Sequence, residues 1–396
     1  MTTDTGRGRW ILPDDLLAAI RAEASRRDLD RALPERAIRH VLDHGLGAAR
    51  VPREHGGRGL TVSALVDELH RLAAADSNVA HAFRGHLAFV EQQFFEPDQE
   101  RRELWFTRIV AGDLVGNAQS EAATRPDLNT TLVDKADGGL ELNGRKYYTT
   151  GSLFADWIDL AARYENETYQ VVVSTKRPGV LSHDDWGGFG QRLTGSGTTI
   201  FDHVTIDRAD IRPYSADHDG FRHPYLMGFY QLMLLSVLSG IARAALEDVV
   251  DYVRPRERTF GVVEAAPPRF DPLVQGILGQ LSSSVFAARA IVRAAAGSLD
   301  AAMDGYADGA GDASLFSAAQ LDVYRAQQPV IDTVLDVTTR LFEVGGASAV
   351  DSGLNLDRHW RNARTVATHN PAVHRLRAIG EWELDRVEPA WPVRPL

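Results

Sequence analysis

Near its C-terminus the chain reads DRHWRNARTVATHNP from Asp357 to Pro371. Three arginines and a tryptophan precede the His-Asn-Pro sequence that ends this stretch. Pro371 has no backbone N–H, and its ring disfavours the helical conformation for Asn370. The pattern therefore predicts a shaped loop that presents His369, followed by a helix that starts at or after the proline.

The composition of the whole chain is that of a globular protein, and it excludes several classes of function. Of 396 residues, 44% are hydrophobic and 24% are charged, which suffices for two or three packed units. The net charge of −11 argues against nucleic acid or an anionic membrane as partner, because both need a basic surface. The absence of cysteine excludes disulfides and thiolate catalysis. We find no signal peptide and expect a cytoplasmic protein.

Three parts follow one another along the chain, and together they predict an α+β fold. Residues 1–111 are expected to be helical, residues 112–213 to form a small antiparallel β domain, and residues 214–396 to form a helical bundle. Within the β domain, Leu140–Tyr148 has the pattern of two strands joined by an Asn-Gly turn. The pattern places this turn at Asn143 and Gly144.

The bundle is predicted from long apolar stretches separated by Pro- or Gly-rich breaks. Helices are expected near residues 226–256, 271–304 and 313–343, and the segment after Pro371 would complete a four-helix bundle. The run 226–250 is apolar enough for a membrane span, but polar residues recur in it at helical spacing. We therefore interpret it as a buried helix of the bundle.

Two segments resemble signatures of the acyl-CoA dehydrogenase superfamily. Val51–Leu60 is similar to a glycine-rich loop of these enzymes, and Arg361–Arg364 is similar to the Arg-Asp-Ala-Lys run that leads to their catalytic glutamate. The place of that glutamate falls on Asn370, with His369 beside it. A histidine there resembles the flavin-dependent monooxygenase branch, the dibenzothiophene monooxygenase group. The resemblance covers about residues 12–390 and implies the acyl-CoA dehydrogenase-like order of helical domain, β domain and four-helix bundle.

Two further blocks are similar to the flavin-binding loops of this superfamily. In Gly116–Glu121, the resemblance implies that Ser120 bonds the flavin ring, while Asn117 faces the flavin, a peroxide or the substrate. In Trp186–Thr198, Trp186 would stack on the flavin or wall an aromatic pocket. Without the resemblance, the first block would be a simple loop after a strand and the tryptophan an ordinary core residue.

Lys146–Trp157 is similar to the block whose aromatic and hydroxyl residues back the flavin ring. The resemblance assigns Tyr148, Thr149 and Thr150 to that role. Alternation places the two threonines on opposite faces of the chain, so either could face the ring.

Arg254–Gly261 resembles the turn with which dehydrogenases bind the FAD pyrophosphate of a neighbouring subunit. Glu257 stands at the place of the family's arginine, between Arg256 and Arg258. Either arginine suits a phosphate, because a guanidinium binds it through two parallel hydrogen bonds. The resemblance also implies a homotetramer built as a dimer of dimers.

Gly345 and Gly346 match the family's second pyrophosphate loop, but Phe342 replaces its glutamine. The contacts to the adenine half of FAD are thereby weakened. The cofactor is expected to be reduced flavin, as FMNH2 or FADH2.

Two reactions remain open. Dehydrogenation needs a carboxylate base, and Asn370 cannot act as one. Glu247, Asp248 or Asp251 on the first long helix of the bundle could replace it, so an acyl-CoA dehydrogenase or a nitroalkane-oxidase-like enzyme is one alternative. A non-catalytic protein with this fold is another.

The favoured reaction is a monooxygenation in which reduced flavin and O2 form a C4a-hydroperoxide. Histidine can donate to the peroxide and manage its proton near neutral pH. His369 fits that role, with Asn117 and the hydroxyl of Thr149 or Thr150 as supporting donors. Asn370 is expected to contact the cofactor.

The substrate is expected to be an aromatic or heteroaromatic small molecule of the indole or thiophene type, and amine N-hydroxylation is a second possibility. No Gly-x-Gly-x-x-Gly follows a strand. We therefore expect a separate NAD(P)H:flavin reductase as partner. The histidine pairs 40/44 and 81/86 have no carboxylate at metal-ligand spacing, so no metal is expected.

Overall fold

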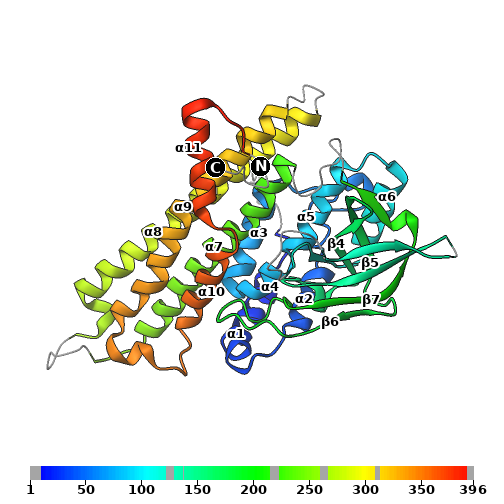
Figure 1. Ribbon diagram of the computed structural model, residues 1–396. Helices are drawn as coiled ribbons and strands as arrows, with labels where there is room; N and C mark the ends of the chain where they lie inside the picture. The colour runs from blue at the N-terminus through cyan, green and yellow to red at the C-terminus, as the bar shows by residue number, and fades with distance from the viewer. Residues whose placement is uncertain are drawn as a thin grey trace, which may run out of the picture.

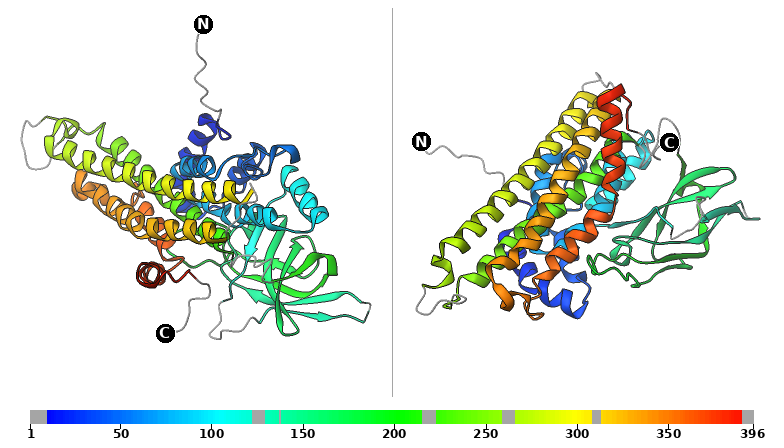
Figure 2. Two further views of the ribbon diagram at one scale, coloured as in Figure 1. Left: turned by 90° about the horizontal axis from the view of Figure 1, so that it is seen from above. Right: turned by 60° about the vertical axis from the view of Figure 1, so that its left-hand side comes forward.

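The computed structural model describes residues 10–121, 129–136, 138–214, 223–258, 266–307 and 313–389. Figures 1 and 2 show a group of N-terminal helices in the middle, a β-sheet on one side and a bundle of long helices on the other. This arrangement confirms the predicted fold class.

The N-terminal part is helical, as expected. Its elements are α1 Asp14–Asp30, α2 Glu35–Asp43, η1 Arg53–His55, α3 Val62–Ala75, α4 Ser77–Ala82, α5 Arg84–Gln92, η2 Gln93–Phe95 and α6 Gln99–Val110. Side-chain oxygens begin two of these helices. Thr61 Oγ1 accepts a hydrogen bond from the Ala64 N–H at 3.1 Å, and Asp76 Oδ1 accepts one from the Asn78 N–H at 2.9 Å. The Asp76 cap sets the start of α4, which together with α5 carries residues of the site.

The middle part is a mixed sheet, and the prediction of a purely antiparallel one was wrong. Its strands are β1 Val115–Ala118, β2 Thr131–Asp134, β3 Leu140–Lys146, β4 Trp157–Tyr164, β5 Glu167–Ser174, β6 Val180–Ser182, β7 Thr199–Ile206 and β8 Ile211–Pro213. They lie in the order β6-β7-β3-β2-β4-β5-β8, with β1 also beside β4. The short strands β1 and β2 share one edge of β4, and both run parallel to it. The other pairings are antiparallel.

The predicted turn at Asn143 and Gly144 was also wrong. β3 runs through both residues and shifts register against β7 between Leu142 and Gly144. Since β3 is paired on both edges, by β2 and by β7, a hairpin within it would leave those ladders unmade. Glycine is needed at 144 because φ is +154° and a Cβ would lie 2.5 Å from Thr130 Cα.

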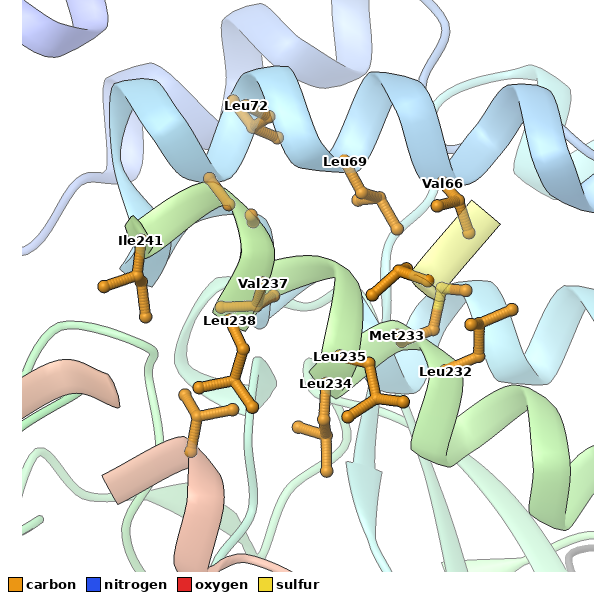
Figure 3. Close-up of a cluster of buried hydrophobic side chains, with 14 of the residues drawn as sticks. Val66, Leu69, Leu72, Leu232, Met233, Leu234, Leu235, Val237, Leu238 and Ile241 are labelled. Carbon is orange, nitrogen blue, oxygen red and sulfur yellow. The ribbon is translucent and has the colours of Figure 1, made fainter. Parts of the chain in front are cut away.

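The C-terminal part is the predicted bundle. Its elements are α7 Pro224–Val253, η6 Pro268–Phe270, α8 Pro272–Ala307, α9 Ala313–Arg340, η7 Leu341–Val344, η8 Gly346–Val350, α10 Asp357–Thr368 and α11 Ala372–Asp385. α7 contacts α3, α8 and α9, and Figure 3 shows leucines of α3 facing leucines of α7. The apolar window of α7 is entirely buried within the fold. The prediction of a core helix rather than a membrane span is therefore confirmed.

The stretch 357–371 is mostly helix, and the prediction of a loop there was wrong. α10 extends to Thr368, and Asp357 in its first turn bonds Arg361 one turn later at 2.7 Å. Ala363 and Val366 bury one face of the helix. The break is confined to residues 369–371, and α11 begins after the proline, as predicted.

Candidate active site

A cavity of about 640 Å³ lies between the sheet and the helices. Its β wall consists of Asn117, Gln119, Ser120, Glu121, Tyr148, Thr150, Trp186, Gln191, Thr194 and Ser196. Its helical wall consists of His81, Arg84, Met227, Tyr230, Thr365, Thr368, His369, Asn370, Pro371 and Arg375. Another cavity of about 650 Å³ lies between α1, α3, α7 and α8, but none of the residues predicted for the flavin site lines it.

The helical wall brings together two histidines that are far apart in sequence. The ring centroids of His81 and His369 are 6.1 Å apart. Desolvation, followed by the charge of Arg84, lowers the pKa of His81 to about 4. The same two causes lower the pKa of His369 well below its ordinary value, although its exposed surface borders the cavity. Both imidazoles are therefore neutral at pH 7, and each has one N–H and one lone pair.

A hydrogen-bond chain orients the ring of His81. Gln191 donates through Nε2 to Ser77 Oγ at 3.0 Å, so its Oε1 is the acceptor that faces His81 Nδ1 at 3.1 Å. This assignment places the His81 proton on Nδ1. His81 Nε2 has no hydrogen-bond partner among the described residues. The lone pair of His81 Nε2 thus lies in the cavity wall and can accept a hydrogen bond.

Asn370 is fixed by its own amide. Its Nδ2 donates to Gln231 Oε1 at 2.8 Å, and its backbone oxygen accepts from Gln327 Nε2 at 2.9 Å. His369 is the C-terminal cap of α10, and its Nδ1 lies 3.3 Å from Asn370 Oδ1. The anchored asparagine holds the residue before it at the rim of the cavity.

The β wall is built of amides, hydroxyls and aromatic rings. Asn117 Nδ2 lies 3.5 Å from the hydroxyl of Tyr230, so the two walls meet there. A Cβ at Gly85 would lie 2.5 Å from Asn117 Cβ, so the start of α5 touches β1 directly. Tyr148 has a φ of +64°, unusual for a residue with a side chain, and its ring contacts that of Trp186 edge to face at 5.9 Å.

The two threonines differ in orientation. Thr150 lines the cavity, and its hydroxyl lies 2.8 Å from that of Ser196. Thr149 Oγ1 instead donates to the Gly197 carbonyl at 3.1 Å and accepts from Thr199 Oγ1 at 2.9 Å. The role predicted for Thr149 is therefore corrected, because its hydroxyl is hydrogen-bonded to neighbouring residues and does not line the cavity.

The residues predicted for the pyrophosphate gather at the other end of α7. Arg256 Nη1 donates to the Gly345 carbonyl at 2.9 Å, and Arg258 is exposed. Between Tyr230 and this end the helix rises by about 35 Å, at 1.5 Å per residue. Within one chain these residues cannot touch a flavin in the cavity. Residues 259–261 of the motif lie outside the described residues.

The alternative bases predicted for a dehydrogenase do not reach the cavity. Asp248 Oδ2 accepts from His359 Nε2 at 2.8 Å and also bonds Arg358, while its Oδ1 accepts from Arg21 at 2.9 Å. Glu247 belongs to the lining of the other large cavity. Within the described residues, these carboxylates on α7 are structural.

Sequence reasoning gave no role to several residues of the site, among them His81, Arg84 and Gln191. His81 was considered only as half of a metal pair with His86, yet the two separate. His86 is buried, its Nε2 lies 3.0 Å from the Gly47 carbonyl, and its Nδ1 accepts from the Val115 N–H at 3.1 Å. Gln191 lies within Trp186–Thr198, but the family resemblance gives it no role. Arg84 had no signal, because nothing near it in sequence marks a cavity.

The cavity fits a flavin. Its volume is in the range of small-molecule sites, and Tyr148 and Trp186 offer aromatic surface beside the hydroxyls of Ser120 and Thr150. Gln119 Oε1 is buried and has no hydrogen-bond partner among the described residues. It could accept a hydrogen bond from a ring N–H of a ligand.

Comparison with known proteins agrees with this geometry. Residues 232–373 match the family described as acyl-CoA dehydrogenase, C-terminal domain. The chain is 31% identical over 373 residues to a probable FMNH2-dependent monooxygenase, SfnC, of Pseudomonas putida, with 91% of each chain covered. The FMN-bound structure of TdsC, a dibenzothiophene monooxygenase of Paenibacillus sp. A11-2, has a TM-score of 0.85 at 26% identity and covers 95% of this chain and 97% of its own. Methanesulfinate monooxygenase MsuC of Pseudomonas fluorescens also has a TM-score of 0.85 at 26% identity, with 95% and 96% covered.

Proposed function

This chain belongs to the flavin-dependent monooxygenases of the acyl-CoA dehydrogenase fold, and we propose that it oxygenates a small aromatic or heteroaromatic molecule in the cavity described above. The observation that carries the proposal is the pair of neutral histidines, His81 and His369, facing a β wall suited to a flavin. The enzyme uses reduced flavin and O2. FMNH2 is favoured over FADH2, because Glu257 and Phe342 stand where an arginine and a glutamine would hold the adenine half.

Bound reduced flavin would supply the two electrons that activate dioxygen; the route through a C4a-hydroperoxide is implied by the family resemblance and stays a prediction. The residues of the β wall would hold the ring. Tyr148 and Trp186 offer surface for stacking, and Ser120 and Gln119 offer hydrogen bonds to its polar edge. Asn117 lies where the two walls meet and would orient the oxygen.

Proton transfer would fall to the two histidines. With Nδ1 bonded to Gln191, His81 offers the lone pair of Nε2. His369 lies at the rim and can donate its N–H to an oxygen between the rings. As a neutral imidazole it can also relay the proton that completes the water molecule, because it accepts a proton at one nitrogen as it gives one from the other. One oxygen atom then enters the substrate and the other leaves as water.

The one carboxylate among the described residues that line the cavity argues against the dehydrogenase alternative. Glu121 is the carboxylate that lines the cavity. It accepts hydrogen bonds from the Asn129 N–H at 2.8 Å, from Lys146 Nζ at 2.9 Å and from the Thr130 hydroxyl at 2.8 Å. These bonds hold its pKa near 2 despite partial burial. A carboxylate so stabilised is a poor base for a carbon-bound proton.

We further propose a separate flavin reductase as partner, a cytoplasmic location and a homotetramer. The sequence has no dinucleotide fingerprint of its own. α8 exposes 76% of Phe286 and 77% of Leu273, which a neighbouring subunit would cover. In such an assembly Arg256 and Arg258 would serve a neighbour's flavin. A monomer in sedimentation velocity with full activity would contradict this.

The function is tested with the purified chain, FMN, NADH, a flavin reductase and ¹⁸O2. We expect mass spectrometry to find one ¹⁸O atom in a product of indole or dibenzothiophene, and no product without the reductase. A parallel assay replaces oxygen and reductase by an electron-acceptor dye and acyl-CoA. Dye reduction there, together with unlabelled indole and dibenzothiophene, would reject the proposal in favour of a dehydrogenase. Labelled hydroxylamine from an amine would favour N-hydroxylation.

A further inference from the structure

Arg84, the first residue of α5, places a guanidinium in the helical wall that has no carboxylate partner among the described residues. Its Nε donates to the Tyr230 carbonyl at 3.2 Å, and its Cζ lies 4.8 Å from the centroid of the Tyr230 ring. Its two terminal nitrogens make no hydrogen bond to the described part of the chain. Burial lowers its pKa to about 10, so the group is still a cation at neutral pH.

Among the described residues, the rest of the cavity does not supply the negative charge that Arg84 lacks. Glu121 is paired with Lys146. Asp159 lies behind the β wall, bonded by Gln119 at 3.0 Å and Gln170 at 2.8 Å, and burial raises its pKa to about 7. Arg84 therefore adds a positive charge to the helical wall, and a buried charge without a carboxylate partner is costly unless a ligand neutralises it.

We propose that the molecule oxygenated by this enzyme carries an anionic group, a carboxylate, sulfinate or sulfonate, which Arg84 binds. The inference rests on the proposed function, because it takes the flavin to lie on the β wall. The anion would then lie on the opposite wall. With Nε held by Tyr230, the two terminal nitrogens can form paired hydrogen bonds to two oxygens of one group.

This placement also orients the substrate. His81, three residues before Arg84, faces His369 across 6.1 Å. An anion held at Arg84 would fix one end of the molecule beside Tyr230 and direct the other end toward Asn117 and the histidines. Arg84 is thus a specificity-determining residue in addition to the aromatic surface of the cavity.

The test compares two probes of the same shape, benzenesulfonate and neutral benzenesulfonamide, by calorimetry on the FMN-loaded protein. We expect Arg84→Met to lower the affinity for benzenesulfonate by roughly 10- to 100-fold, the usual contribution of a hydrogen-bonded charge pair. Binding of benzenesulfonamide and of FMN, oxidised and reduced, should stay within about twofold, and Arg84→Lys should recover part of the loss. Arg26→Met, at an exposed arginine of α1, is the matched control.

Several results would overturn the inference. An equal loss of affinity for both probes would show that Arg84 acts through packing. A loss of affinity for FMN, with both probes bound as before, would show that Arg84 binds the flavin. Equal binding of the probes by the unchanged protein, or failure of both Arg84 variants to fold, would also reject it. If the anion binds through Arg84 but no substrate is oxygenated with reductase present, the proposed function fails and the anion site stands. If neutral aromatics are oxygenated but anionic probes do not bind, the anion site fails and the proposed function stands.

Discussion

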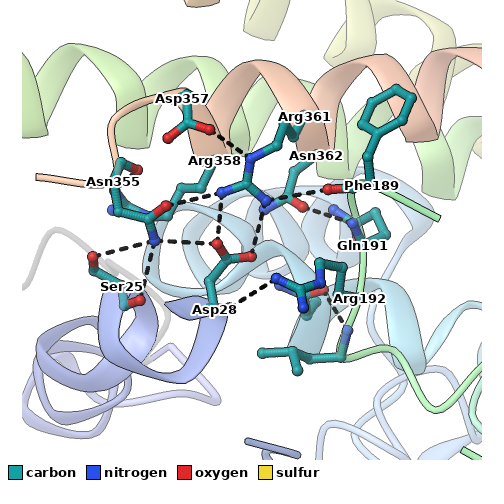
Figure 4. A network of polar contacts seen from close by, with 12 residues as sticks. Ser25, Asp28, Phe189, Gln191, Arg192, Asn355, Asp357, Arg358, Arg361 and Asn362 are labelled. Atoms are coloured by element: carbon teal, nitrogen blue, oxygen red, sulfur yellow. Dashed lines mark hydrogen bonds and ion pairs between the residues drawn. The ribbon is translucent and has the colours of Figure 1, made fainter. Parts of the chain in front are cut away.

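The two ends of α10 have opposite surroundings. At its N-terminal end, Arg358 and His359 bond Asp248, and Arg361 bonds Asp28 at 2.7 Å. Figure 4 shows Asp28 between Arg361 and the amide of Asn355. At its C-terminal end, the side chain of His369 has a single long contact with Asn370 Oδ1, at 3.3 Å, among the described residues. One helix thus joins a network of ion pairs to the rim of the cavity.

The difference shows that environment, rather than residue type, separates an anchoring histidine from a reactive one. Both His359 and His369 have a pKa below the ordinary value, first because of burial. His359 faces a carboxylate whose own pKa is held well below its usual range: burial opposes this, but the His359 hydrogen bond and the charges of Arg358 and Arg21 prevail. His369 faces open space and a second neutral imidazole. The anchored end makes the position of the free end reproducible.

Asp248→Ala should have the largest effect, and on stability. It leaves Arg358 and His359 without their partner, and breaking a buried ion pair costs about 3–5 kcal/mol of unfolding free energy. Urea unfolding followed by circular dichroism measures this cost. Asp251→Ala, on the same helix but 62% exposed and 3.5 Å from Arg21, should cost less than about 1 kcal/mol. Equal effects of the two changes would show that the anchored end is not anchored by Asp248.

His369→Ala should act on turnover instead. Loss of an acid–base group lowers the rate by roughly 10²-fold or more, and stability should change by less than about 2 kcal/mol. Hydrogen peroxide release should rise, because activated oxygen is no longer passed to the substrate. The exposed His374 of α11 provides the control, and His374→Ala should do neither. Unchanged rate and coupling in His369→Ala would make this end of α10 structural as well.

Acid should weaken the anchored end of α10. The pKa of His359 is about 4 in the folded chain against 6.5 for the free side chain, so the unfolded state binds more protons between these values. Stability is therefore lost as pH falls through this window, by up to about 2 kcal/mol at pH 5 from this residue. His359→Gln should flatten the pH dependence of the unfolding free energy. An unchanged pH dependence in His359→Gln would contradict the low pKa of this residue in the folded chain.

Asn370→Ala should have the smallest effect. It removes the 2.8 Å bond to Gln231, worth about 1 kcal/mol. Peroxide release should rise by a factor of about 2–5, since His369 loses its fixed neighbour at a cost of under about 1 kcal/mol in its positioning. A double-mutant cycle with Gln231→Ala isolates the bond from other effects. A coupling energy near zero would show that the Asn370–Gln231 hydrogen bond does not position His369.

Much of the fold and the β wall could be predicted from the sequence, because local patterns carry them. The long helices of the bundle follow apolar periodicity, and Asn117, Ser120 and Trp186 lie in blocks that resemble a known family. The error at 357–371 was avoidable. His359, Asn362, Ala363, Val366 and Ala367 recur at helical spacing, and the proline at the end of the stretch outweighed that signal.

The helical wall was harder to predict, because it exists only after distant segments meet. Arg84 lies at an ordinary helix start, and its proposed role depends on the absence of a carboxylate near it among the described residues. The choice between Thr149 and Thr150 likewise required their partners, Gly197 and Ser196. No pattern within one segment contains such information.

Gly85 has a practical consequence for altering the range of substrates. At this position the two walls are separated by no side chain, since even a methyl group would lie 2.5 Å from Asn117 Cβ. Any replacement would displace Asn117, whose amide we propose orients the oxygen. The close approach of α5 to β1 at this point thus depends on the absence of a side chain at residue 85. Libraries made to admit larger molecules should leave residue 85 unchanged and vary Met227, which lines the cavity with a side chain that can be shortened.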